Sequence, residues 1–472
     1  MQLNISAENI SGLTEYEIPR LNKLFELFNA HSFGNIQKNK YYEGRISLDE
    51  VNLGIALPES IKGLEIGCAW GAKCVDVLAA RSMFDGFVGT NGEDIADLDQ
   101  ITADNNLIFE YMKACRDELK FGCTFATLSA DDDIGVKIRF HSPQTAAAMW
   151  NGEKGRIDCG FAIIDSVVDE IDSNIWTPSV INYYTDDYVW VFRGINNQWY
   201  AEAYPHSMGR PLIEPLIWNA TSNKPFGRSR IKEPIRRLIQ GYVRTIANAT
   251  IGLEFSTSPQ KYLLGVTDEQ FDVVINQKFR QYIGSIIAAT PNPETGQNPQ
   301  FGQLMQGNIS PHVEMIRILA TQFSAATGLT VTDTGVVSEA NPTSADAVLA
   351  QSQTLVAMAE QLNVGNGDAL RNIALMAQAI KNSVPLDDLT ESQRDVMAHF
   401  KNPAMPSVAA TTDAAIKIAS VRQEFGATDT FLEMIGFDKA SIRKIKAEES
   451  RVRGLITLEE IEADDTIVEN MA

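Results

Sequence analysis

The sequence predicts an α+β fold, in which a region of short strands is followed by long helices. Between Phe121 and Tyr204 the chain contains short runs rich in β-branched and aromatic residues, which favour strands. From Pro225 onward apolar residues recur every three or four positions over long segments, which indicates amphipathic helices. The 472 residues exceed what a single hydrophobic core organises, so we expect two or three packed regions.

The N-terminal half is expected to begin with helices and to continue as sheet. The apolar stripe Leu21, Leu24, Phe25 and Phe28 predicts a helix from about Thr14 to Ser32. Two more helices are expected at Trp70–Ser82 and Leu107–Lys120. The strands expected after them are Phe121–Leu128, Val136–Phe140, Cys159–Ile164, Val180–Tyr184, Tyr188–Arg193 and Trp199–Tyr204. This order predicts a mixed α+β region at 1–226.

The second half is expected to be helical, with one small αβ insert. A long helix is expected at Ser229–Leu253, where Pro234 falls near the first turn and does little harm. The insert is expected to be strand Lys261–Val266, helix Asp268–Ile287 and loop Thr290–Gln300. After it we expect a helix from Ser310 with Gly328 as its C-terminal cap, an irregular segment Leu329–Asn341 and a helix from about Ser344 to Lys381. An extended stretch and shorter helices should complete the chain: Ala398–Ser407, Ala409–Glu424, Thr428–Ile435 and Lys439–Val452.

The charge of the chain excludes a tight, sequence-independent binder of nucleic acid. Forty basic against 61 acidic residues give a formal net charge of −21, so the surface should not attract phosphate broadly. This charge is still compatible with a protein channel through which DNA slides, because sliding benefits from weak attraction. No apolar run of about 18 residues predicts a membrane span, and the N-terminus lacks a signal-peptide pattern, so we expect the protein to be made in, and to stay in, the cytoplasm.

The reactive side chains show no pattern typical of an enzyme. The five cysteines lack a CxxC pair and have no histidines at ligand spacing, so we expect buried thiols rather than a disulfide framework or a zinc site. No GxxxxGK[ST], HExxH or GxSxG motif is present, and we predict neither catalysis nor a cofactor. Asp131, Asp132 and Asp133 could bind a hard cation, but three consecutive acids more often form a solvated turn, which we favour.

One motif supports an enzymatic alternative. Residues 64–71 read LEIGCAWG, which is similar to the first glycine-rich loop of a methyltransferase that binds a nucleotide methyl donor. Ala69 stands where that loop has a glycine, and no strand ending in Asp or Glu follows about 20 residues later, as the motif requires. We therefore keep the methyltransferase only as the alternative hypothesis.

A set of short motifs, in one order, resembles the siphophage-type portal protein family of tailed bacteriophages. Each motif is weak alone, but the ordered set extends over roughly residues 40–420. The motifs are Tyr41-Tyr42-x-Gly44, Leu53-Gly54-Ile55-x-x-Pro58, the helix with Trp70, Val75, Asp76, Leu78 and Arg81 before Gly86-Phe87, Pro225-Phe226-Gly227-Arg228-Ser229-Arg230-Ile231, Thr327-Gly328-Leu329, Asn341-Pro342-Thr343-Ser344-Ala345-Asp346-Ala347, and Asn402-Pro403 to Asp413-Ala414-Ala415-x-Lys417.

The resemblance implies a portal fold and a ring, typically of twelve subunits, at one capsid vertex of the virion. It implies that double-stranded DNA passes through the ring non-specifically, and that the terminase large subunit, the head-tail adaptor, and the major capsid and scaffolding proteins bind to it. Another head-tail connector ring remains an alternative. The implied regions are wing 1–226, first stem helix 227–254, clip 255–309, second stem helix 310–328, tunnel loop 329–343, long wing helix with return strand 344–408, and C-terminal crown 409–472.

Three groups of residues are the candidate sites under this resemblance. The tunnel loop would present to DNA the residues Thr332, Asp333, Val336, Val337, Glu339 and Asn341, although an ordinary surface connection is the simpler alternative. The clip would meet terminase or adaptor through Asn292, Glu294, Gln297, Asn298 and Gln300. The stem would contact neighbouring subunits through Arg228, Arg230, Arg236, Arg237, Leu238, Ile239 and Tyr242. The basic residues, with Lys232, could instead face DNA or terminase; we favour pairing between subunits, and expect nearby carboxylates to offset their position at a helix N-terminus.

Overall fold

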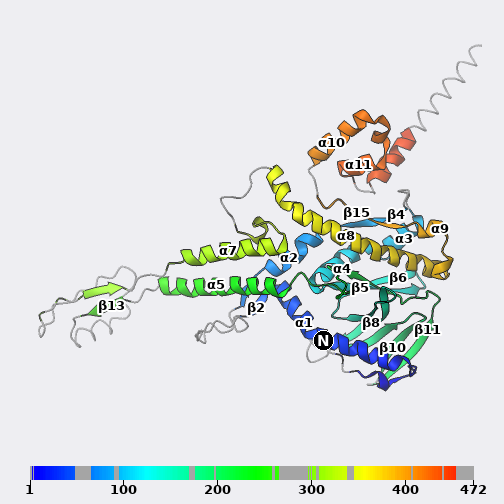
Figure 1. The fold of residues 1–472 in the computed structure, drawn as a ribbon, viewed down its shortest axis with the longest axis horizontal. Coiled ribbons are helices and arrows are strands. Elements are labelled where there is room, and N and C mark those ends of the chain that lie inside the picture. Colours follow the sequence, from blue (N-terminus) through cyan, green and yellow to red (C-terminus); the bar gives the residue numbers. More distant parts are fainter. Residues whose placement is uncertain are drawn as a thin grey trace, which may run out of the picture. The chain divides into compact units, whose positions relative to one another are not determined.

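A computed structural model gives the fold of the chain (Figure 1). It describes residues 3, 5–47, 65–89, 95–168, 176–195, 198–257, 261–264, 296, 298, 300–303, 308–336, 345–404, 408–437 and 441–452. The chain forms two compact units. The first consists of Met1–Ala30, Val77–Gly227 and Ser352–Ala472, and the second of His31–Asp76 and Arg228–Gln351. Helices and sheets are both present, in agreement with the predicted α+β class.

A six-stranded sheet is the largest element of the first unit. Its order is β1-β11-β10-β9-β8-β7; β1 joins β11 in parallel, and the other pairs are antiparallel. The strands are β1 (Ile10–Ser11), β7 (Ala146–Asn151), β8 (Arg156–Val168), β9 (Trp176–Tyr184), β10 (Tyr188–Ile195) and β11 (Gln198–Pro205). The N-terminal part of helix α1 (Glu17–Glu43) covers one face with the predicted stripe Leu21, Leu24, Phe25 and Phe28.

A second layer of the same unit contains a three-stranded sheet with order β12-β5-β6. Its strands are β5 (Cys123–Asp131), β6 (Gly135–His141) and β12 (Ile213–Ile217). Helix α4 (Leu107–Phe121) packs on this sheet, and on the C-terminal part of α8 (Ala345–Asn382) through Glu118 and Tyr111, which accept hydrogen bonds from Asn366. Strand β4 (Phe84–Val88) pairs with β15 (Met397–Phe400), and helix α3 (Ala96–Asp104) packs beside β4.

Short helices complete the described C-terminal part. They are η5 (Leu386–Asp388), α9 (Glu391–Arg394), α10 (Val408–Val421), η6 (Gln423–Ala427), α11 (Asp429–Ile435) and a helix over 441–452. Thr428 accepts a hydrogen bond from the Phe431 amide and so caps the start of α11. An ion pair of 2.6 Å joins Arg443 to Asp99 of α3. The N-terminal turn η1 (Ala7–Asn9) lies directly before β1.

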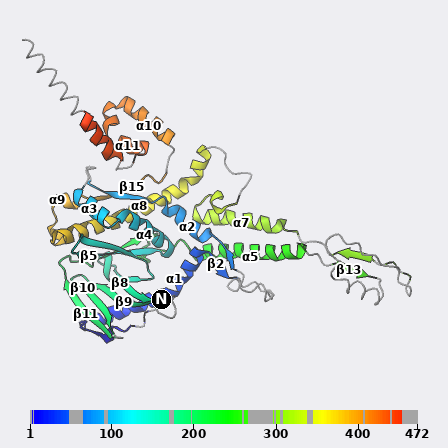
Figure 2. The same ribbon diagram turned by 180° about the vertical axis from the view of Figure 1, so that it is seen from behind.

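The second unit is built around two long helices. Helix α5 (Glu233–Thr257) leads to β13 (Lys261–Leu264), which pairs antiparallel with β14 (Gln300–Gln303) before the chain returns along α7 (Ser310–Thr327). Figures 1 and 2, which view the molecule from opposite sides, both show α5 and α7 side by side. Helix α2 (Trp70–Ala79) and the ribbon of β2 (Arg45–Ser47) and β3 (Glu65–Gly67) also contribute to this unit.

The structure differs from the sequence predictions mainly in long-range pairing. Helix α1 extends to Glu43, beyond its predicted end at Ser32, so Tyr41 and Tyr42 are helical. The short strands β1, β2, β3 and β4, and strands β7, β12 and β14, were not predicted. Strand β7 is rich in alanine, and β12 contains Pro215, which is tolerated because β12 is an edge strand. The expected helix Asp268–Ile287 lies outside the described residues.

All five cysteines are free and buried, as predicted. Burial raises the pKa of Cys68 and of Cys159 to about 11, so both remain protonated thiols at neutral pH. Within the described ranges, no group of three or more metal-binding side chains comes together. In the same part of the chain, no helix is long and apolar enough to cross a bilayer.

Candidate functional site: the α5 and α7 hairpin

The two helices of the second unit pack against one another along an apolar stripe. On α5 the buried residues Ile235, Ile239, Val243 and Ala247 recur every four positions, which places them on one face. On α7 the residues Leu319, Ala320 and Phe323 are buried. Gly241 allows close approach, because a Cβ there would lie 3.2 Å from Cδ2 of Leu319. The hairpin therefore has a core of its own.

The hairpin also exposes apolar side chains that its own core does not use. Val313, Met315 and Ile318 of α7 are each 44–46% exposed, and Leu253 of α5 is 45% exposed. At 100° per residue, Ile318 lies well away from the direction of Leu319 and Phe323, which are buried. By the same geometry Met315 and Ile318 lie about 60° apart and share one face of α7, whereas Val313 lies about 140° or more from both. Exposed apolar residues on one face of a helix are typical of a surface that binds another protein.

A buried arginine ties the start of this helical region to two other segments. Arg230 is 8% exposed, and its guanidinium donates to the carbonyl oxygens of Cys74 in α2 and of Thr327 at the end of α7; the second distance is 2.7 Å. The C-terminus of a helix carries partial negative charge, so a guanidinium there is favourable. Burial lowers the pKa of Arg230, although an arginine stays charged at neutral pH.

Trp70 joins both helices to the loop that follows α7. Its ring centroid lies 4.6 Å from that of Tyr242 in α5 and 4.9 Å from that of Phe323 in α7. Its indole Nε1 donates to the carbonyl oxygen of Thr334 at 3.1 Å. The sequence placed Trp70 in the portal-family helix motif and in LEIGCAWG, and Phe323 in the apolar stripe of its helix, but it did not predict the contact between the two rings.

The described start of the loop, up to Val336, is an ordered turn. Gly328 ends α7 with a φ of 73°, as predicted for its C-terminal cap, and Thr332–Thr334 forms the 3₁₀ turn η4. The carboxylate of Asp333 accepts from the amide of Thr330 at 2.9 Å and from its hydroxyl at 2.8 Å. Asp333 therefore stabilises the turn within its own chain. Of the other loop residues with a predicted role, Thr332 is exposed and Val336 is half-buried. The remaining three, Val337, Glu339 and Asn341, lie outside the described residues.

The stem residues predicted to contact neighbouring subunits fall into two sets. Arg230 and Ile239 are buried within the chain, so the prediction for these two is wrong: they contact α2, α7 and the hairpin core instead. Arg236 and Arg237 both pair with Glu233 in the first turn of α5, at 2.6 and 2.8 Å. This carboxylate offsets the unfavourable position of the two cations at the helix N-terminus, as expected.

The remaining residues of these predictions are placed as follows. Arg228 and Lys232 are exposed, and Leu238 and Tyr242 are half-buried. In the clip, Asn298 and Gln300 are exposed, whereas Asn292, Glu294 and Gln297 lie outside the described residues. Gln300 opens β14 and pairs with Leu264, so it belongs to a strand rather than to the end of a loop.

The glycine-rich motif of residues 64–71 has a packing role in the structure. β3 pairs with β2 in an antiparallel ribbon, whereas a nucleotide-binding loop follows a strand of a parallel sheet. A Cβ on Gly71 would overlap the carbonyl oxygen of Tyr41, so glycine is needed where α2 meets α1. The acidic run at residues 131–133 also has a local role, because Asp131 Oδ1 accepts from the amides of Asp133 and Ile134 in the β5–β6 turn.

The chain contains an α+β unit and a helical hairpin that exposes apolar residues, and such exposure is typical of a subunit that associates with further protein chains. Residues 13–454 match the model of the family described as phage portal protein, SPP1 Gp6-like. The chain belongs to this family of phage portal proteins.

Two of the solved structures to which the chain is similar come from gene transfer agent particles. One chain of the virion of a native particle has 10% identity and a TM-score of 0.45, with 76% of this chain and 87% of that chain covered. A chain from the neck of an empty particle has 12% identity and a TM-score of 0.45, with 74% and 84% covered. No curated protein sequence matches the chain.

Proposed function

We propose that the chain is the subunit of a portal ring, with twelve copies at one vertex of a phage capsid. The ring is the passage for double-stranded DNA during packaging and ejection, and the platform on which the terminase large subunit and then the head-tail adaptor dock. Its role is mechanical, and ATP hydrolysis belongs to the terminase. Family membership over residues 13–454 supports this proposal.

The observation that carries the proposal is the exposed apolar surface of α7. Val313, Met315 and Ile318 remain 44–46% exposed although the hairpin already has a buried core. A ring gives every subunit two identical neighbours, so the same surface is covered in each copy. The exposed residues of the stem prediction, Arg228 and Arg237, and the half-buried Leu238 and Tyr242 lie on the same two-helix unit and are proposed to contact those neighbours.

The charge of the chain suits a passage in which DNA slides. The chain carries a formal charge of −21, and the loop after α7 contains Asp333 and Glu339 but no lysine or arginine between Gly328 and Asn341. Affinity for DNA comes largely from lysine and arginine that displace counterions from phosphate. We propose that Thr332, Val336, Val337 and Asn341 of this loop face the DNA without fixed counter-charges.

The remaining partners are assigned to other parts of the subunit. The clip residues Asn292, Glu294, Gln297, Asn298 and Gln300 are proposed to meet the terminase and the adaptor. The wing and the C-terminal crown are proposed to meet the major capsid and scaffolding proteins. The ring would form in the host cytoplasm and become part of the virion.

The first test is the mass and shape of the purified full-length chain. Sedimentation velocity should give a species of about twelve times the 52.0 kDa of one chain, and negative-stain images should show a ring with a central hole. A chain that remains a monomer at every concentration would contradict the proposal.

A substitution on α7 then tests which surface assembles the ring. Ile318→Asp should abolish rings, because a charge forced into a buried contact costs several kcal/mol, on the order of 2 to 5. The monomer should still fold, since the Ile318 side chain is 45% exposed and its loss leaves the hairpin core intact. The matched control Ile318→Val keeps the apolar character and should assemble. Normal rings with Ile318→Asp would show that this face of α7 lies outside the contact.

A further inference from the structure

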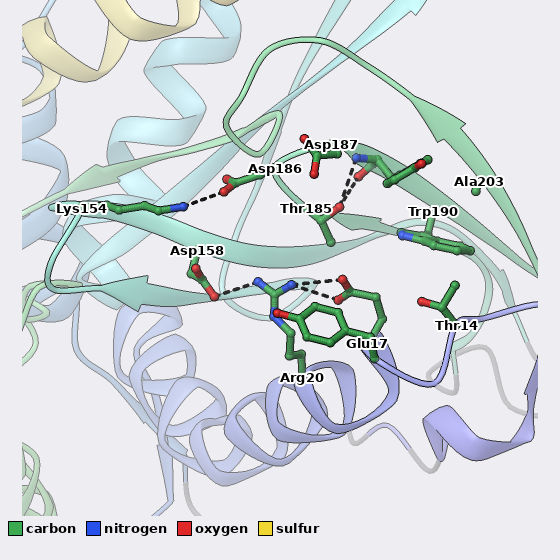
Figure 3. Close-up of a pocket in the computed structure, with 12 residues that line it drawn as sticks. Thr14, Glu17, Arg20, Lys154, Asp158, Thr185, Asp186, Asp187, Trp190 and Ala203 are labelled. Carbon is green, nitrogen blue, oxygen red and sulfur yellow. Dashed lines mark hydrogen bonds and ion pairs between the residues drawn. The ribbon is translucent and has the colours of Figure 1, made fainter.

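The first unit contains a pocket that the ring proposal does not use. Its volume is about 630 Å³, and it lies between the start of α1, the turn that joins β7 to β8, and the hairpin of β9 and β10 (Figure 3). The chain segments that line it come from residues 14–20, 154–158, 185–190 and Ala203 of β11. All belong to one compact unit, so the pocket is a property of that unit alone.

One wall of the pocket consists of side chains that form ion pairs and hydrogen bonds with one another. Arg20 donates to Asp158 at 2.8 Å and to Glu17 at 3.1 Å, and the hydroxyl of Tyr183 donates to Glu17. Burial acts to raise the pKa of Asp158, but the hydrogen bonds from Arg20 and Asn151 outweigh it, so the pKa is lowered. These groups are therefore fixed and already satisfied, and they form a rigid wall.

One buried donor in the pocket has no acceptor. Trp190 is 6% exposed, and its indole Nε1 makes no hydrogen bond to any described residue. Figure 3 shows the nitrogen edge of its ring turned toward Thr185 and Arg20, into the pocket. Leaving a buried N–H unpaired is unfavourable, so this group indicates a hydrogen-bond acceptor supplied from outside the chain.

Acidic side chains outnumber basic ones around the pocket, which favours a positively charged ligand. Glu17, Asp158, Asp186 and Asp187 line it, against only Arg20 and Lys154. Lys154 pairs with Asp186 at 2.7 Å. Asp187 is exposed at the turn; its backbone carbonyl accepts from the His206 amide, and its carboxylate lies near enough to His206 to act on its pKa, but among the described residues it forms no ion pair.

Two exposed aromatic rings flank this acidic opening. Tyr16 is 75% exposed and Tyr188 is 43% exposed, and both line the pocket. The Tyr188 ring lies 5.9 Å from that of Trp190, measured between centroids. Aromatic faces attract cations and also cover the aliphatic stem of a long basic side chain.

We propose that this pocket binds a lysine or arginine side chain of a partner polypeptide. The cation meets Asp187, the aliphatic stem lies against Tyr16 and Tyr188, and a backbone carbonyl of the same polypeptide accepts from Trp190 Nε1. A free polyamine has donors only and leaves the indole unsatisfied, while an anion is repelled by the carboxylate of Asp187, because the other three carboxylates are paired with Arg20 and Lys154. This site goes beyond the ring proposal and stands whether or not the chain forms rings.

The test uses the full-length chain and a blocked peptide in which one lysine is flanked by two alanines on each side. Saturation-transfer NMR detects weak ligands of large proteins, so the assembly state does not limit it. The lysine peptide should bind at least about fivefold more tightly than the same peptide with norleucine, the uncharged isostere, and than 1,5-diaminopentane, because each lacks one of the two polar contacts. Equal binding of the three probes would overturn the proposal.

Single substitutions test each of the two proposed polar contacts separately. Trp190→Phe keeps the ring and removes the donor, and Asp187→Asn removes the exposed charge; each should weaken the lysine peptide about fivefold. Asp132→Asn, at another exposed turn of the same unit, is the matched control and should bind like the wild type. Because Asp187 is exposed, its variant keeps the fold, and unchanged affinity in Asp187→Asn would refute the assignment even if Trp190→Phe were destabilised.

Discussion

Replacing Arg230 with methionine should loosen the junction between α2, the end of α7 and the loop after it. The substitution keeps the long apolar stem but removes the donors to the carbonyl oxygens of Cys74 and Thr327. A buried acceptor left without its partner costs about 1–3 kcal/mol, and two of them cost roughly 2–6 kcal/mol. Removing a desolvated charge offsets part of this loss. We therefore expect a net destabilisation of about 2–4 kcal/mol.

Amide hydrogen exchange measures this effect where it occurs. In the last turn of α7, around Phe323 and Thr327, a loss of about 2–4 kcal/mol accelerates exchange by a factor on the order of 30 to 1000. The matched control is Arg237→Met, because the Arg237 side chain is 72% exposed and its ion pair with Glu233 contributes at most about 1 kcal/mol. Exchange in Arg230→Met within twofold of the wild type would refute the role given to this guanidinium.

Three further predictions concern other parts of the chain. Gly71→Ala should destabilise the second unit by about 1–3 kcal/mol in thermal unfolding, since its Cβ would overlap the Tyr41 carbonyl oxygen, whereas Gly67→Ala, with open space around it, should have a small effect. Burial raises the pKa of Glu118 to about 8, so the folded chain retains a proton that the unfolded chain releases near pH 4.5. The free energy of unfolding should therefore fall as pH rises from 4.5 to 8, by about 2 kcal/mol between pH 6.5 and 8, and denaturant titrations should show that Glu118→Gln removes this dependence. Deleting Thr332–Asn341 should leave rings assembled but impair the packaging or retention of DNA, and normal head filling would remove the tunnel-loop assignment.

The helices were the part of the fold that the sequence predicted best. The stripe Leu21, Leu24, Phe25 and Phe28 predicted which face of α1 is buried, and the cap at Gly328 predicted where α7 ends. Both signals are local, since they depend on neighbours within one or two turns. The missed strands depend on distant partners: β7 consists largely of alanine and is held by β8.

The candidate site was predicted less completely, for the same reason. Sequence spacing predicted one helix for Arg230 and Ile239, but α5 begins only at Glu233, and the spacing did not show that the chain itself buries both residues. The partners of Arg230 lie 156 and 97 residues away, at Cys74 and Thr327, and no periodicity connects such positions. The unpaired indole of Trp190 is also visible only once the strands are assembled.

Added salt should affect the exposed arginines in the first turns of α5 and the buried Arg230 before it differently. Glu233 with Arg236 and Arg237 is an exposed charge group, which dissolved ions screen over about 10 Å at 0.1 M. Arg230 meets neutral carbonyl groups in a buried position, where ions do not reach it. Concentrated salt should therefore weaken the ion pairs within the first turns of α5, while the hydrogen bonds from Arg230 to α2 and to the end of α7 stay in place.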